Sequence, residues 1–239
     1  MLIIFYTLLT VLSCVSSVKV LTQKPSVLTE QKGNSVIMDC NIAKHENYVY
    51  WYKQLPNAAP QFVLRFYHPL SSPDQYGDSF PSNRFTSKTK SNIDYQLIIN
   101  NVEIGDSAVY YCGTWDSSVN EGVFGQGTKL MVTDSAVPPP VVNILPSTED
   151  QSSSKITLVC LINDMAMGFA DVRWLVNGIS VTDGVFTSSA EQQSNEKFKM
   201  SSYFTIERSE WEKDKDLTCE VTVGSRVTTR NIKKSHCSD

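Results

Sequence analysis

Two Cys…Trp…Cys series, one in each half of the chain, restrict the possible folds more than any other feature of this sequence. The series consist of Cys40, Trp51 and Cys112, and of Cys160, Trp174 and Cys219. The gaps between the two cysteines are similar in both halves, which favours one disulfide inside each of two domains. An indole packed on a buried disulfide fills the centre of a β-sandwich. In a chain of 239 residues, the repeated series therefore predicts two β-sandwich domains.

Alternation along the expected strands places these cysteines and tryptophans on inward faces, because successive side chains of a strand point to opposite faces of its sheet. Tyr110 precedes Cys112 by two positions, which fits a tyrosine corner, whose hydroxyl bonds back to the main chain. No helical periodicity of useful length occurs, so we predict an all-β protein. The expected inward residues are Val36, Met38, Cys40, Val49, Trp51, Ala108, Tyr110 and Cys112 in the first half, and Ile156, Leu158, Cys160, Leu217, Cys219 and Val221 in the second.

A proline-rich segment separates the two halves. Residues 134–140 read Asp-Ser-Ala-Val-Pro-Pro-Pro, and three successive prolines cannot belong to a central strand. Such a segment favours extended polyproline geometry and forms a semi-rigid linker. We therefore expect a first domain at 18–133, a linker at 134–140 and a second domain at 141–239.

The N-terminus has the pattern of a secretory signal. An apolar run at residues 2–12 precedes small residues that suit cleavage after Ser17. A buried first strand is the alternative interpretation. The run is shorter than the roughly 20 residues that a membrane span needs. We expect residues 1–17 to be a signal peptide, the mature chain to be secreted, and no part of the chain to span a membrane.

The number of cysteines predicts a disulfide to another chain. Of six cysteines, Cys14 belongs to the expected signal peptide, which leaves an odd number. Cys237 remains after the two intradomain pairs, and it lies near a chain end that can reach a partner. Metal ligation is the alternative, but the sequence has no Cys-x-x-Cys pair, and His45, His68 and His236 are scattered singly. We therefore expect no metal or other cofactor.

The outward side of the strand that carries Trp51 is rich in tyrosine. If Trp51 faces the core, alternation makes Tyr50, Tyr52 and Gln54 face outward. Tyr111 faces outward on the returning strand for the same reason. Isolated surface tyrosines are common, but several on one sheet face form an apolar patch of the kind that marks a partner site. We expect this face to dock on another polypeptide.

Composition and motifs argue against other functions. The chain has 21 basic and 25 acidic residues, a balance that does not suit nucleic-acid binding. We find no Ser-His-Asp arrangement, paired-carboxylate motif or metal cluster in the sequence, so we expect no enzymatic activity. The Gly125-Gln-Gly127 segment could belong to a dinucleotide-binding loop, but it lacks a third glycine and a following helix. We expect a β-bulge there, with φ above zero.

Several motifs resemble those of immunoglobulin light chains. They are Trp-Tyr-Lys-Gln at 51–54, Asp-Ser-Ala-Val-Tyr-Tyr-Cys at 106–112, Phe-Gly-Gln-Gly-Thr-Lys-Leu at 124–130, and the near-terminal Cys237. The resemblance covers everything after the expected signal and implies two immunoglobulin-like β-sandwiches, variable-type at 18–133 and constant-type at 141–239. The sequence departs from the commonest light chains in a longer stretch between Arg65 and Arg84, and around Phe169, where proline is usual. With these departures, it resembles a light chain of a lower vertebrate.

The resemblance implies that an immunoglobulin heavy chain is the partner. Cys237 would form the interchain disulfide, and Arg84 and Asp106 match an ion pair at the lower end of the variable domain. In the constant domain the face that meets the heavy chain is open between two alternating sets, which are Ser201, Tyr203 and Thr205, or Ser202, Phe204 and Ile206. The heavy-chain interface expected on the variable domain comprises Tyr50, Tyr52, Gln54, Pro60, Tyr111 and Phe124.

Three loops at one end of the variable domain are expected to contact antigen. They span approximately 43–48, 66–80 and 113–123, and they are rich in the Tyr, Trp, Ser, Asn and Gly residues that paratopes use. Trp115 could instead pack on the framework or the heavy chain, and His45 could be a solvated loop residue. The expected contact residues are His45, Glu46, Asn47, Tyr48, Thr114, Trp115, Asp116, Ser117, Ser118 and Asn120.

The resemblance therefore implies an antibody light chain, which pairs with a heavy chain and contributes to antigen binding in adaptive humoral immunity. Such a chain would be secreted, or held at the cell surface through a membrane-bound heavy chain. The alternative is a soluble antigen-receptor chain of the T-cell type. Chains of that family continue past the constant domain into a connecting peptide and a membrane helix, whereas this sequence stops at Asp239.

Overall fold

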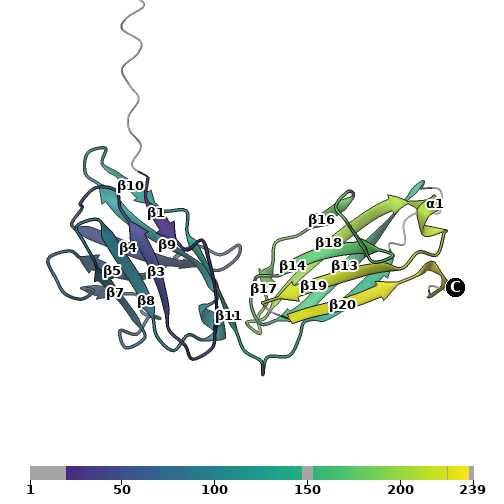
Figure 1. The fold of residues 1–239 in the computed structure, drawn as a ribbon, viewed down its shortest axis with the longest axis horizontal. Helices are drawn as coiled ribbons and strands as arrows, with labels where there is room; N and C mark the ends of the chain where they lie inside the picture. The colour runs from purple at the N-terminus through teal and green to yellow at the C-terminus, as the bar shows by residue number, and fades with distance from the viewer. Residues whose placement is uncertain (1–19, 147–152, 225, 237–239) are drawn as a thin grey trace, which may run out of the picture.

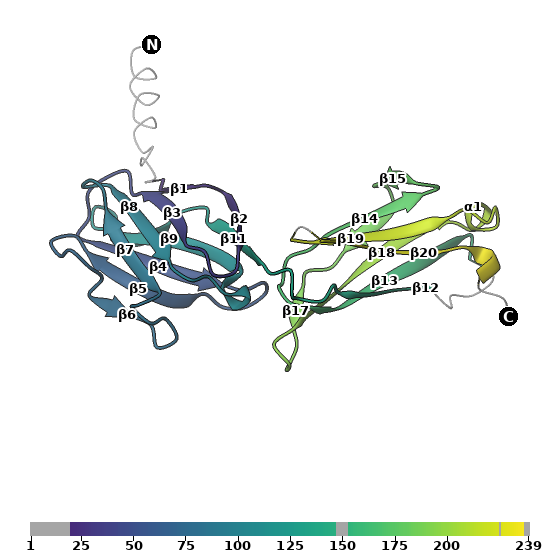
Figure 2. The same cartoon turned by 60° about the horizontal axis from the view of Figure 1, so that its bottom comes forward.

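The computed structural model describes residues 20–146, 153–224 and 226–236, which form two β-sandwiches joined by residues 134–140 (Figure 1, Figure 2). The all-β prediction is confirmed, because the helices of the described residues are short: α1 (Arg208–Trp211), η1 (Ile104–Asp106) and η2 (Lys234–His236). None of the described helices is long and apolar enough to cross a membrane. The expected signal peptide at 1–17 and Cys237 lie outside the described residues.

The first sandwich packs a four-stranded sheet against a larger one. The smaller sheet has the order β1 (Thr22–Lys24), β3 (Val36–Asn41), β8 (Asp94–Ile99) and β7 (Phe85–Thr89). The larger sheet has the order β2 (Val27–Gln31), β11 (Thr128–Thr133), β9 (Ala108–Asp116), β4 (Tyr48–Gln54), β5 (Gln61–Tyr67) and β6 (Gln75–Tyr76), with β10 (Glu121–Phe124) also paired to β9. Strands β2 and β11 pair in parallel, and the other neighbours are antiparallel.

The second sandwich has two antiparallel sheets. One has the order β12 (Val141–Pro146), β13 (Lys155–Met165), β18 (Phe198–Glu207) and β16 (Val185–Thr187), with β17 (Glu191–Gln192) also paired to β18. The other has the order β15 (Ile179–Val181), β14 (Asp171–Val176), β19 (Leu217–Val223) and β20 (Arg226–Ile232).

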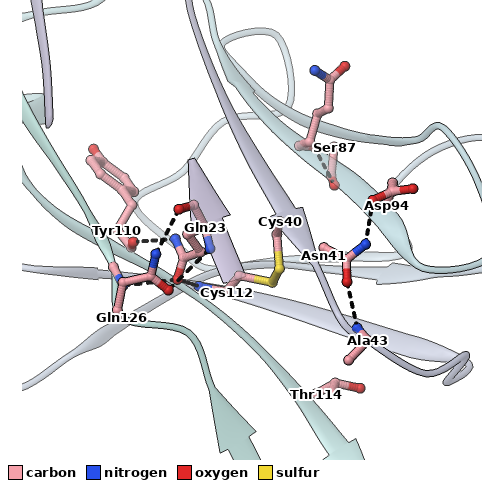
Figure 3. The surroundings of a disulfide bond; sticks show 12 residues. Gln23, Cys40, Asn41, Ala43, Ser87, Asp94, Tyr110, Cys112, Thr114 and Gln126 are labelled. Carbon is pink, nitrogen blue, oxygen red and sulfur yellow. Dashed lines mark hydrogen bonds between the residues drawn. A yellow bond between two sulfur atoms is a disulfide. The ribbon is translucent and has the colours of Figure 1, made fainter. Parts of the chain in front are cut away.

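A disulfide and a tryptophan occupy the centre of each sandwich, as the sequence predicts. Cys40 bonds Cys112 at a separation of 72 positions (Figure 3), and Cys160 bonds Cys219 at a separation of 59. Both tryptophans of the two series are fully buried, and all of the predicted inward residues are buried with them. The period-two alternation therefore reports the inward faces of both domains correctly.

The end of the first sandwich that contains η1 holds the tyrosine corner and the ion pair that the sequence suggests. The Tyr110 hydroxyl donates to the main-chain oxygen of Asp106 at 2.8 Å, and burial raises the pKa of Tyr110 well above its usual value. Arg84 and the Asp106 carboxylate form an ion pair in which the carboxylate is nearly buried. The ammonium of Lys53 donates to the main-chain oxygen of Gly105, and burial lowers the pKa of Lys53, although Asp106 opposes this effect. This end of the domain is held by buried polar contacts.

The segment between the two sandwiches is restrained by the second one. Strand β11 ends at Thr133, and β12 begins at Val141. The guanidinium of Arg226 donates to the main-chain oxygens of Ser135 at 2.5 Å and Val137 at 2.8 Å. Arg226 of the second sandwich therefore restrains this segment through two hydrogen bonds.

Candidate functional site

The outer face of β4 and β9 carries a cluster of aromatic side chains. Tyr52 lies opposite Tyr111 in the strand register, and its ring centroid is 5.7 Å from that of Phe124 and 5.9 Å from that of Phe62. Tyr50 faces outward on the same strand and is partly exposed, as are Tyr52 and Tyr111. Phe124 is 56% exposed. We call Phe62, Tyr52, Tyr111 and Phe124 the variable face.

Phe62 is a member of the variable face that the sequence pattern does not single out. The register between β4 and β5 shifts between Trp51 and Tyr52, which marks a β-bulge. As a result Val63 and Leu64 are both buried, and Phe62 lies opposite Tyr52. Two consecutive buried residues at a bulge break strict alternation, so the orientation of Phe62 emerges only with the strand pairing.

The variable face has a polar edge at the turn between β4 and β5. The Gln54 amide donates to the main-chain oxygen of Ala58 at 3.0 Å, and Pro60 is exposed at the end of this turn. Burial raises the pKa of the Tyr52 hydroxyl, and interaction with Tyr50 acts in the same direction. Both effects favour the uncharged hydroxyl, which suits a tyrosine in an apolar contact.

A buried glutamine holds the strand that presents Phe124. The side-chain oxygen of Gln23 accepts from the amides of Cys112 at 3.0 Å and Gly127 at 3.2 Å, while its amide donates to the Tyr110 main-chain oxygen at 2.9 Å (Figure 3). A Cβ on Gly125 would approach the Gln23 side-chain oxygen to 2.4 Å, so glycine is required for this close approach.

The two glycines of this segment interrupt the sheet as expected for a bulge. Strand β10 ends at Phe124 and β11 begins at Thr128, and both pair with β9. Gly127 has φ of +87°, as predicted from the sequence. Gln23 is only 2% exposed, and no sequence signal distinguishes it from a surface glutamine. The bulge and Gln23 together place the Phe124 ring against Tyr52.

Three loops of the first sandwich meet at the end opposite the tyrosine corner. The rings of His45 and His68, which precede β4 and follow β5, have centroids 4.7 Å apart. The amide of His68 donates to the main-chain oxygen of Asn47 at 2.8 Å. The Ser117 hydroxyl contacts the Glu46 carboxylate at 3.5 Å. The structure therefore brings together the three segments from which antigen contacts are expected.

The side chains expected to contact antigen divide into two groups. Thr114 is buried and donates to the main-chain oxygen of Tyr48 at 2.8 Å, and Asp116 is buried and accepts from the amide and hydroxyl of Ser118. These two side chains shape the third loop from inside. Glu46 and Tyr48 are partly exposed. The exposed members are His45, Asn47, Trp115, Ser117, Ser118 and Asn120.

A cluster beside the loop end is not expected from the sequence. The Tyr48 ring stacks on Tyr67 with centroids 4.8 Å apart, and the guanidinium of Arg65 lies 4.9 Å from the Tyr48 ring centroid. Arg65 also forms an ion pair with Asp74 at 2.6 Å. These residues come from strand ends that become neighbours only when β4 and β5 pair, so composition alone does not group them.

The second sandwich has an apolar row on the outer face of the sheet that contains β13 and β18. Leu145, Val159, Tyr203 and Phe186 are successive partners across β12, β13, β18 and β16. Leu145 is 50%, Phe186 67% and Tyr203 37% exposed, and the rings of Phe186 and Tyr203 lie 6.1 Å apart. We call this row the constant face.

The structure shows which of the two alternating sets of residues on β18 faces outward. Ser202 and Phe204 are buried, whereas Tyr203 points outward between Ser201 and Thr205 on the same side of β18. On the outer side of the opposite sheet, Arg173 pairs with Glu220 across β14 and β19, and Val227 of β20 is exposed in the same sheet. The outward set is therefore Ser201, Tyr203 and Thr205.

Comparison with protein families agrees with this architecture. The immunoglobulin V-set domain family matches residues 23–133, and the immunoglobulin C1-set domain family matches residues 142–225. The chain belongs to the immunoglobulin superfamily, as a V-set domain followed by a C1-set domain. It thus has the two-domain plan of an antigen-receptor chain.

One relative of known name supports the same class. The chain is 30% identical over 191 residues to a viral T-cell receptor beta chain-like protein of feline leukemia virus. The match covers 77% of this chain and 58% of that relative, so the chain spans less than two thirds of the relative's length.

Proposed function

We propose that this chain is an antibody light chain, which pairs with a heavy chain through its variable and constant faces and contributes three loops to an antigen-binding surface. The observation that carries the proposal is the aromatic cluster of Tyr52, Phe62, Tyr111 and Phe124 on an outer sheet face. Soluble monomers rarely leave contiguous apolar patches exposed, and large ones mark sites for another protein.

The presence of a second apolar face favours a partner with the same two-domain plan. The constant face lies on a different domain and joins Leu145, Tyr203 and Phe186 in one row. A partner with one sandwich could cover only one of the two faces. A heavy chain, with its own variable and constant domains, would cover both.

The exposed residues of the loop end suit ligand recognition. Trp115 is 50% exposed and offers a large rigid surface, while Ser117, Ser118 and Asn120 offer hydrogen-bonding groups. Thr114 and Asp116 would support the third loop rather than touch a ligand, because both are buried. We propose secretion after removal of residues 1–17 and a disulfide from Cys237 to the heavy chain.

A soluble T-cell-receptor-like chain is the second candidate, because the name of the viral relative refers to a T-cell receptor beta chain. Both candidates use the same folds and the same kind of face. They differ in the partner, since a receptor chain would pair with a second receptor chain rather than with a heavy chain.

The test is co-expression of the full chain in secretory cells, with either a heavy chain or a T-cell-receptor alpha-type chain from the same organism. We expect non-reducing electrophoresis to show a disulfide-linked species with the heavy chain only. Cys237→Ser should remove the covalent link but leave the pair associated in size-exclusion chromatography. Covalent pairing with the receptor chain alone would overturn the light-chain assignment in favour of the second candidate.

A matched pair of variants locates the interface. Tyr52→Ser combined with Phe124→Ser should weaken pairing in the Cys237→Ser background by about tenfold or more, since interface aromatics carry much of the binding free energy. Ile37→Ser is the control, because Ile37 is 48% exposed on the outer face of the opposite sheet. Equal effects of the two changes would show that the variable face is not the contact surface.

A further inference from the structure

Two histidines face each other at the loop end of the variable domain. His45 is exposed, His68 is partly buried, and their ring planes meet at 74° with centroids 4.7 Å apart. They come from segments that are distant in sequence, and the hydrogen bond from the His68 amide to the Asn47 main-chain oxygen fixes the spacing. No contact of the pairing faces described above involves either ring.

Each imidazole is held through the same ring nitrogen. His45 Nδ1 lies 3.1 Å from the main-chain oxygen of Asn92. Because a carbonyl can only accept, this nitrogen carries the proton, and in the neutral imidazole Nε2 keeps its lone pair. His68 Nδ1 lies 2.9 Å from the hydroxyl of Tyr95, which can accept in the same way. Histidine ligands of metals have this arrangement, in which the second nitrogen donates to a fixed oxygen.

The separation of the rings fits a shared metal ion. Two imidazoles bound through Nε2 at about 2.0–2.1 Å, with an angle between octahedral and tetrahedral values, have centroids roughly 4.4–5.1 Å apart. The observed 4.7 Å lies within that interval. We propose that His45 and His68 form a binding site for a divalent transition-metal ion of the kind that prefers imidazole, such as Zn²⁺ or Cu²⁺.

The site would have open coordination positions. Among the residues that the structure describes, no group of three or more His, Cys, Asp or Glu side chains is placed to hold a metal. The chain therefore supplies two ligands, and water or a donor atom on a bound molecule completes the coordination. Since the pair lies between two of the three loops, a bound ion would add a ligand-accepting centre to that surface. The proposal does not depend on which partner chain is used.

The test is titration of Zn²⁺ into the full chain by calorimetry, in the Cys237→Ser background so that a thiol cannot compete. We expect one saturable site, and a loss of affinity of about tenfold or more in both His45→Gln and His68→Gln. His236→Gln is the matched control, because His236 is the remaining histidine of the sequence and lies in η2 of the other domain. With Cu²⁺ as the probe, electron paramagnetic resonance should report two coordinating nitrogens in the parent chain and one in each site variant.

A positioning role for Tyr95 gives an independent readout. Tyr95→Phe keeps both ligands but removes the hydroxyl that holds His68, so Zn²⁺ affinity should fall by about tenfold. Circular dichroism and thermal unfolding without metal check that each variant is folded. If the variants at His68 or Tyr95 do not fold, the variant at the exposed His45 is sufficient for the test. Unchanged affinity in His45→Gln, no saturable binding, or loss of binding in His236→Gln would each overturn the proposal and leave the rings as a packing contact only.

Discussion

The two sandwiches have the same core plan, but their apolar outer faces lie on different sheets. In the variable domain the aromatic face lies on the sheet that contains the Trp51 strand, β4. In the constant domain the Trp174 strand, β14, belongs to the sheet whose outer side carries the Arg173–Glu220 ion pair, and the apolar row lies on the other sheet. The outer face of a sandwich is thus independent of its core, because inward and outward residues alternate along each strand.

The two tryptophans also differ in their surroundings. The Trp174 indole N–H donates to the Ser202 hydroxyl at 3.1 Å, whereas the buried Trp51 indole nitrogen has no hydrogen-bond partner among the described residues. Both rings are fully buried. The constant core therefore contains a polar contact at the position where the variable core relies on packing alone.

The largest expected effect tests whether the two cores are equivalent. Replacing both Cys40 and Cys112 by alanine should lower the free energy of unfolding of the variable domain by about 2–5 kcal/mol, and replacing Cys160 and Cys219 should cost the constant domain a similar amount. The costs should be similar because the closed loops are of similar length, 72 and 59 residues. Denaturant unfolding of the full chain measures both transitions, and a shift of both by one variant would show that the domains do not unfold separately.

A smaller effect should distinguish the ion pairs of the two domains. Asp106→Ala should destabilise the variable domain by about 2–4 kcal/mol. The Arg84 guanidinium would lose the ion-pair partner that offsets its desolvation, and the hydrogen bond from the Glu103 amide would also be lost. Arg173→Ala, at a side chain that is 60% exposed, should cost the constant domain less than about 1 kcal/mol. The measurement is again the midpoint of each unfolding transition; equal costs would contradict the difference in burial.

The smallest effect concerns the tryptophan contact. Ser202→Ala should cost the constant domain about 1–3 kcal/mol, because the Trp174 N–H is left unsatisfied and the bond with the Thr187 hydroxyl is lost. Ser201→Ala, on the outer side of the same strand, is the matched control and should cost less than about 0.5 kcal/mol. Thermal unfolding of both variants is the measurement. No difference between them would show that the indole contact contributes nothing.

The direction in which the strand residues point, toward the core or away from it, can be predicted directly from the sequence. The Cys…Trp…Cys series predict Trp51, Trp174 and their cysteines at the centres of the sandwiches, and alternation predicts the outward direction of Tyr52 and Tyr111. These features depend only on the two-residue period of a strand.

The rest depends on pairing between distant segments. Phe62 joins the variable face because of a bulge, and Gln23 becomes buried because it bonds β9 and the segment after Phe124. The His45–His68 contact arises from the register of β4 and β5. Local sequence does not determine these contacts, because each one depends on pairing between strands that are far apart in the chain.

We expect a partner chain to cover the variable face and the constant face together. Hydroxyl-radical footprinting labels exposed aromatic side chains, so we would apply it to the full chain alone and after co-expression with a heavy chain. We expect Tyr52, Phe124, Phe186 and Tyr203 to be protected in the complex, with His45 at the loop end labelled equally in both samples. Unchanged labelling of those four aromatic side chains in the complex would show that neither face is covered by the partner.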